Sequence, residues 1–88
     1  MLCCKITVRG KVQGVGFRAF VKAAANSLSV SGWCRNLPDG SVEITVKCDG
    51  IAMEKFLEAV KQGPRKAVVE DVSVFPAEYD GGLGFAIR

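Results

Sequence analysis

Hydrophobic residues in this chain repeat with two different periods, in stretches that alternate along the sequence. In residues 2–9, apolar and polar side chains alternate one by one, the pattern of a β-strand covered on one face. From Phe17 to Leu28, apolar residues recur every three or four positions, which is typical of an amphipathic helix. Because each period fits one kind of secondary structure, the order of the stretches limits the possible folds.

The remaining segments indicate a hairpin, a second helix with an apolar stripe at Met53, Phe56, Leu57 and Val60, and one or two more strands. The hairpin is predicted as a strand at 30–35, a turn at 37–40 and a strand at 41–48. In the second of these strands we expect Val42, Ile44, Val46 and Cys48 to face inward. The helix is predicted from Asp49-Gly50 to a stop at Gly63-Pro64, and it is followed by a strand at 68–75 and a short edge strand at Phe85–Ile87.

The resulting order is β-α-β-β-α-β. It predicts a ferredoxin-like α+β sandwich, in which two helices cover one face of an antiparallel sheet of four to five strands. With 88 residues, 49% of them hydrophobic and 24% charged, residues 1–88 are expected to form a single domain. This fold hosts many activities, so function has to be argued from particular residues.

The net charge and the first residues of the chain limit the kinds of partner and the compartment that we expect. The net charge of +3 is spread without a run of like charge, which favours small anions over nucleic acid. Met1 leads directly into the alternating segment without a long apolar stretch, so neither secretion nor membrane insertion is indicated. The expected compartment is the cytoplasm.

The four cysteines are Cys3, Cys4, Cys34 and Cys48. A reducing cytoplasm and the absence of a CxxC pair favour packing roles, although a disulfide between two of them stays open. Neighbouring residues of a strand point to opposite faces, which makes Cys3 and Cys4 poor partners for one metal ion. The chain has no histidine, and no metal site is expected.

A glycine-rich segment joins the first strand to the first helix. Residues 10–16 contain three glycines, and we expect a loop there. Glycines before a helix N-terminus let backbone N–H groups surround an anion, and Arg18 adds a planar fork of donors. The spacing matches neither nucleotide P-loops nor dinucleotide folds. The alternative is that Gly14 and Gly16 only form a tight turn and that Arg18 is a solvated helix residue.

A second polar residue of interest, Asn36, ends the second predicted strand directly before the turn at 37–40. Its amide can orient a water molecule without taking part in proton chemistry, and the alternative is a plain turn residue. Trp33 is interpreted as a packed aromatic rather than a substrate platform, and Asp39 as a structural turn residue.

Two segments, Gly10-Lys-Val-Gln-Gly-Val-Gly-Phe-Arg18 and Gly32-Trp-Cys-Arg-Asn36-Leu-Pro-Asp-Gly40-Ser-Val42, resemble the signature motifs of the acylphosphatase family. The resemblance implies a metal-free and cofactor-free hydrolase that converts a small acyl phosphate to a carboxylate and inorganic phosphate. It implies that a motif arginine and asparagine are catalytic, here Arg18 and Asn36, and that the phosphoryl group is bound by Arg18 and the loop backbone at Gln13, Gly14, Val15, Gly16 and Phe17. We expect a monomer with no nucleic-acid or membrane partner.

The chain departs from the family pattern at two positions. Cys34 stands where a small aliphatic residue is more common, and we expect an oxidisable thiol exposed close to Asn36. Ser29 stands where a glycine is common after the first helix, and a positive φ there would cost about 1 kcal/mol.

Two other functions are weighed against hydrolysis. An RNA-recognition domain would need exposed aromatics on its sheet, and the strands at 2–9 and 41–48 have none. A related module could instead bind carbamoyl phosphate or another acyl phosphate for a partner enzyme. Because the sequence stops at Arg88 without an extension, we expect a free-standing hydrolase.

Overall fold

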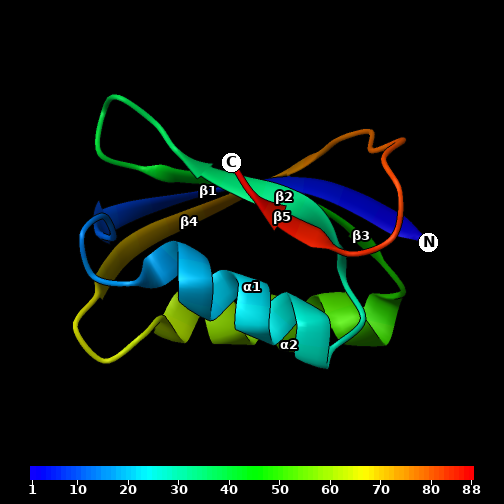
Figure 1. The fold of residues 1–88 in the computed structure, drawn as a ribbon, viewed down its shortest axis with the longest axis horizontal. Coiled ribbons are helices and arrows are strands. Elements are labelled where there is room, and N and C mark those ends of the chain that lie inside the picture. Colours follow the sequence, from blue (N-terminus) through cyan, green and yellow to red (C-terminus); the bar gives the residue numbers. More distant parts are fainter.

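The computed structural model describes all 88 residues as one layer of strands and one layer of helices (Figure 1). The elements follow the predicted order, and their bounds are β1 (Leu2–Lys11), α1 (Phe17–Ser27), β2 (Ser31–Asn36), β3 (Val42–Cys48), α2 (Gly50–Gln62), β4 (Val68–Pro76) and β5 (Phe85–Ile87). Both helices cover the same face of the sheet, as predicted (Figure 1).

The sheet has the strand order β4-β1-β3-β2-β5. The pairs among β1 to β4 are antiparallel, as predicted, but β5 pairs with β2 in parallel. The sheet is therefore mixed rather than purely antiparallel. The segment after β4 reverses the chain and carries it to the opposite edge, so β5 runs in the direction of β2.

The predicted loop at 10–16 begins too early, because Gly10 and Lys11 still belong to β1. After a register shift between Arg9 and Gly10, these two residues pair with Val69 and Val68 of β4. Gly10 has φ 128°, and a Cβ atom there would collide with the Val68 carbonyl oxygen. This glycine thus serves close backbone approach at a β-bulge instead of loop flexibility.

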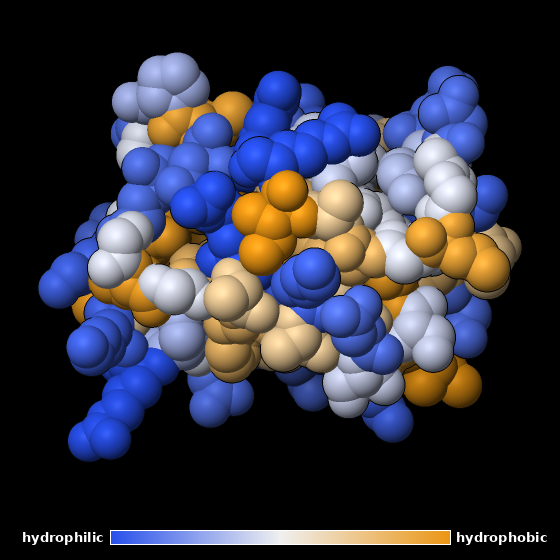
Figure 2. All heavy atoms as spheres, viewed as in Figure 1, coloured by the Kyte–Doolittle hydropathy of each residue, from blue (hydrophilic) through white to orange (hydrophobic).

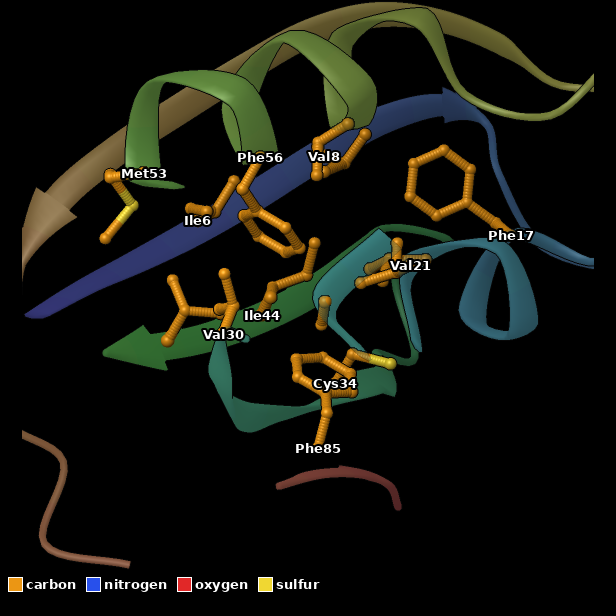
Figure 3. Packing of buried hydrophobic residues seen from close by; sticks show 14 of the residues in the cluster. Ile6, Val8, Phe17, Val21, Val30, Cys34, Ile44, Met53, Phe56 and Phe85 are labelled. Atoms are coloured by element: carbon orange, nitrogen blue, oxygen red, sulfur yellow. The ribbon is translucent and has the colours of Figure 1, made fainter. Parts of the chain in front are cut away.

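The core fills the space between the two layers. Inward-facing residues of the strands meet the apolar stripes of both helices, and their side chains point toward one another in Figure 3. The predicted inward set of β3 is confirmed, with Val42, Ile44, Val46 and Cys48 all buried. In α2, Met53, Phe56 and Val60 are buried, while Leu57 is only partly buried at the margin of the core.

The C-terminus of α1 has the geometry expected at Ser29, whose φ is +56°. The Val30 N–H donates to the Ala25 carbonyl at 2.8 Å, and the Ser29 N–H donates to the Asn26 carbonyl at 3.4 Å. These two bonds are those of a Schellman motif, in which a glycine is the usual residue at the left-handed position. Ser29 therefore carries backbone strain that a glycine would avoid.

Candidate active site

Three strand ends bring the two sequence motifs together. Val42, at the start of β3, pairs with Val8 of β1 on one side and with Asn36, at the end of β2, on the other. The loop that leaves β1 and the β2–β3 turn accordingly lie at the same end of the sheet (Figure 1). Segments more than 20 residues apart in the sequence thus share one site.

The loop before α1 presents backbone donors that the protein does not use. Gly14 and Gly16 have φ values of 73° and 77°, in the left-handed region that favours glycine. No backbone hydrogen bond outside the regular elements has Gly14, Val15 or Gly16 as donor. The first N–H groups of a helix also lack intrahelical partners, and Gly16 offers no side chain to cap them. Several backbone N–H groups at the positive end of α1 thus have no partner within the protein.

Two hydrophobic side chains anchor the loop before α1 to the core. Phe17 is buried in the core between the sheet and α2, and Val15 is packed against the same cluster. The side chains of these two predicted site residues are thus directed into the protein. These two residues can therefore bind a ligand through their backbone N–H groups.

Gln13 ties the loop to the hairpin. Its side-chain Nε2 donates to the Leu37 and Ser41 carbonyl oxygens, both at 2.9 Å. Two hydrogen bonds from one amide hold the two motifs in a fixed relation, which a binding site needs for preorganisation. The sequence had placed Gln13 in the phosphate-binding segment but gave no sign of this bracing role.

Asn36 has an unsatisfied amide oxygen. Its Oδ1 is buried and has no hydrogen-bond partner in the protein. Leaving a buried acceptor unpaired costs about 1–3 kcal/mol, so such a group calls for a specific explanation. It lies on the same face of β2 as the buried Cys34, toward α1, because side chains of a strand alternate.

The turn itself is held by Asp39, as predicted. The Asp39 carboxylate accepts hydrogen bonds from the Ser41 backbone N–H and hydroxyl, which hold the pKa of this exposed carboxyl below its usual value. Asn36 takes no part in these bonds. The interpretation of Asn36 as a plain turn residue is therefore weakened.

Arg18 lies in the first turn of α1. Its Nη1 contacts the Arg88 backbone oxygen at 3.5 Å, which is a long hydrogen bond. The side-chain ion pairs are Arg9 with Asp71 and Arg35 with Glu43, so Arg18 is not paired with the side chain of any aspartate or glutamate. Its guanidinium group thus retains most of its donors for a ligand.

Cys34 does not have the exposed thiol that we expected. It is completely buried, because α1 lies against this face of β2, and its Sγ contacts the Arg18 carbonyl at 4.0 Å. Burial raises the pKa of the Cys34 thiol to about 11, and the nearby charge of Arg18 lowers it only in part. At neutral pH this sulfur is a protonated packing group and not a nucleophile.

The cysteines and acidic residues form neither a disulfide nor a metal-binding cluster. All four cysteines are free thiols, and no cluster of three or more histidine, cysteine or acidic side chains could hold a metal ion. Neither helix is long and apolar enough to cross a membrane.

Trp33 is half-buried as predicted, but its ring packs against two guanidinium groups, those of Arg35 and Arg88.

Fold and site together define a small α+β protein with unused backbone and guanidinium donors at the start of one helix. The family model for acylphosphatases matches residues 4–87. An acylphosphatase of Thermus thermophilus is 49% identical over 80 residues, which cover 91% of each chain. One of Archaeoglobus fulgidus is 42% identical over 87 residues, covering 99% of this chain and 98% of the relative.

Solved structures agree with these sequence matches. The crystal structure of acylphosphatase from Bacillus subtilis superposes with a TM-score of 0.95 at 42% identity, covering 100% of this chain and 99% of the other. Full-length HypF, in its phosphate- and nucleotide-bound form, matches with a TM-score of 0.86 at 27% identity over 99% of this chain but 12% of its own. The chain belongs to the acylphosphatase family, and the predicted enzyme class and ferredoxin-like fold are confirmed.

Proposed function

We propose that this protein hydrolyses the carboxyl–phosphate bond of small acyl phosphates, with Arg18 and the loop N–H groups of residues 13–17 holding the phosphoryl group. The observation that carries the proposal is the set of unused backbone donors at the start of α1, next to the Arg18 guanidinium, which has no aspartate or glutamate partner. Backbone N–H groups at a helix N-terminus and an arginine fork are the groups that proteins use to bind phosphate dianions.

Asn36 orients the attacking water in this proposal. Its side chain lies on the α1 side of β2, and its buried oxygen is not used by the protein. The water oxygen forms a bond to phosphorus while the bond from phosphorus to the acyl oxygen breaks. The electron pair of that bond leaves with the carboxylate, and the water proton passes to a phosphoryl oxygen, which gives a carboxylate and H₂PO₄⁻.

No protein group is needed to move the proton. The carboxylate is a good leaving group, and a loose phosphoryl-transfer transition state requires mainly positioning and charge stabilisation. The residues near the site fit this requirement: the chain has no histidine, Asp39 is engaged by Ser41, and Cys34 is protonated. We further propose that the protein works as a monomer in the cytoplasm, without metal or cofactor.

A second candidate function is a module that binds carbamoyl phosphate or another acyl phosphate for a partner enzyme. The match to a small part of full-length HypF favours keeping it, since a domain of this fold occurs there in a much longer chain. The matches over nearly the whole length of curated acylphosphatases favour the hydrolase.

Hydrolysis of benzoyl phosphate in excess chelator tests the proposal. We expect Arg18→Ala to lower kcat/KM by roughly 10²–10³, because it removes a donor aimed at the phosphoryl charge. The substitution also weakens inhibition by inorganic phosphate. The matched control Arg65→Ala changes an exposed arginine outside the site and leaves both quantities unchanged.

Asn36→Ala separates catalysis from stability. We expect kcat to fall by about 10² because the water loses its orienting group, while phosphate inhibition persists. The free energy of unfolding does not fall, since a buried and unsatisfied acceptor is removed. Asn26→Ala, at an exposed position of α1, is the control. A folded wild-type protein that binds phosphate without turnover would overturn the hydrolase in favour of the binding module.

A further inference from the structure

Three sulfur-bearing side chains lie at one end of the sheet. Cys4 is near the start of β1, and Cys48 ends β3, whose last residues pair with the first residues of β1. Met53 lies in the first half of α2 and contacts Cys4, with 3.8 Å between Cys4 Sγ and Met53 Sδ. Figure 3 shows the Met53 side chain pointing from α2 toward this end of the sheet. The proposed phosphate site lies at the opposite end, where β1 leads into α1.

Cys4 and Cys48 are on the same face of the sheet, the one that packs against the helices. Leu2 pairs with Cys48 and Cys4 pairs with Val46, so the two cysteines are diagonal neighbours on adjacent strands. Side chains on such a diagonal are within reach of each other. Their charges also interact, since the pKa of the Cys48 thiol is raised by burial and, to a smaller extent, by the charges of Asp49 and Cys4.

The contact between Cys4 and Met53 has the spacing of two ligands in a trigonal sulfur site. A metal–thiolate bond is about 2.3 Å long, so three sulfurs in a plane around one ion lie about 4 Å apart. The observed 3.8 Å between the two sulfurs meets this requirement. The cysteines do not form a metal site together with acidic residues, and a site here needs the methionine as a ligand. Cys48 supplies the third sulfur from the neighbouring strand.

We propose that Cys4, Cys48 and Met53 bind a monovalent copper ion, Cu(I), between the start of β1, the end of β3 and α2. Thiolate and thioether sulfurs are ligands that select Cu(I). Structural zinc sites take four ligands, and iron–sulfur clusters take four cysteines, so both fit less well. The chain has no histidine to act as a fourth ligand, and the neighbouring carboxylate of Asp49 caps α2 through the Ala52 N–H.

The ion can enter from the side of Cys4. Cys48 and Met53 are almost fully buried, whereas Cys4 is half-buried. Figure 2 shows hydrophobic side chains at the surface of this end of the molecule, where Figure 1 places the N-terminus, and Met1 and Leu2 are both exposed. An apolar shell limits the access of water to a metal site. Binding releases the protons of both thiols to solvent, and the copper keeps its oxidation state.

Anaerobic titration of the reduced protein with Cu(I), in competition with a chromogenic Cu(I) chelator, measures the affinity. We expect one equivalent to bind tightly to the wild-type protein. Cys4→Ser should lower this affinity by more than about 100-fold, because changes outside the ligand shell already cost roughly 10–100-fold. Met53→Leu conserves the volume of the core and should lower the affinity by about tenfold. The matched control Cys3→Ser removes a thiol of the same strand from the opposite face and leaves the affinity unchanged.

Stability distinguishes a folded site from thiols that bind copper in any state of the chain. One equivalent of Cu(I) should raise the free energy of unfolding of the wild-type protein and of Cys3→Ser but not of Cys4→Ser, because folding brings the three ligands together. X-ray absorption should show three sulfur neighbours of copper in the wild-type protein and two in Met53→Leu.

An affinity that is unchanged in Cys4→Ser or Met53→Leu would overturn the site. An equal loss in Cys3→Ser, or a lower stability on addition of Cu(I), would also overturn it. None of these measurements depends on hydrolysis, so they test the copper site independently of the proposed function.

Discussion

The two helices of this protein begin in opposite ways. α2 follows Asp49, whose carboxylate accepts a hydrogen bond from the Ala52 N–H at 2.8 Å. α1 follows Gly16, which has a left-handed φ of 77° and no side chain to cap the helix. A side-chain cap stabilises a helix by about 1 kcal/mol, so α1 lacks a contribution that α2 has. In our proposal, the phosphoryl group of the substrate takes the place of the missing cap.

The electrostatics of the two helix starts differ in the same sense. The first turn of α1 contains no acidic residue and carries Arg18, whose charge adds to the positive end of the helix. At α2, the carboxylate of Asp49 offsets that positive end. One helix start therefore attracts an anion from solution, whereas the other already has one bound within the chain.

Giving α1 the kind of cap that α2 has should produce the largest effect. We expect Gly16→Asp to lower kcat/KM for benzoyl phosphate about 100-fold or more, because its carboxylate competes for the first-turn N–H groups and repels the phosphoryl group. A Cβ atom at this position meets no other atom within 4 Å, so the effect is not one of space.

Gly16→Asn is the matched control for charge. It has nearly the same shape and tolerates a left-handed backbone, and its expected loss of kcat/KM is clearly smaller. If the aspartate and asparagine variants lost activity equally, the loss would come from the backbone and not from competition for an anion site.

Removing the cap from α2 should affect stability alone. We expect Asp49→Ala to lower the free energy of unfolding by about 1 kcal/mol, because the Ala52 N–H loses its acceptor. Urea denaturation measures this change, and Asp49→Ser should retain most of the stability. A matching loss in kcat/KM would show that the two helix starts are not functionally separate.

The smallest effect is expected at the other end of α1. Ser29→Gly should raise the free energy of unfolding by about 0.5–1 kcal/mol, because glycine adopts the observed φ of +56° without strain. Ser27→Gly, within the last turn of α1, should lower it instead, since glycine disfavours helix. Both variants keep wild-type kcat/KM. A destabilised Ser29→Gly variant would contradict the strain assigned to this residue.

Features that depend on local periodicity were predictable from the sequence. The alternation in 41–48 correctly indicated the four inward residues of β3, and the glycines with Arg18 indicated where unused donors would be found. Features that depend on distant pairing were not. Gly10 belongs to β1 because it pairs with β4, and β5 is parallel to β2 because of a connection that crosses the whole sheet.

The same distinction holds within the site. The sequence indicated Arg18 and Asn36 through the family motifs, and both lie at the end of the sheet where the motifs meet. It could not indicate that Gln13 braces the β2–β3 turn, that Arg88 contacts Arg18, or that α1 buries Cys34. Each of these depends on how separate elements pack, which one segment of sequence does not encode by itself.

The most direct test of the central proposal is a titration of the isotope-labelled protein with inorganic phosphate in excess chelator, followed through its backbone amide NMR signals. We expect the amide signals of Gly14, Val15, Gly16, Phe17 and Arg18 to shift together and saturate with one dissociation constant. The amides at the start of α2, where Asp49 already caps the helix, should not move. Shifts absent from the α1 loop, or equal at both helix starts, would contradict a phosphoryl site at the uncapped helix.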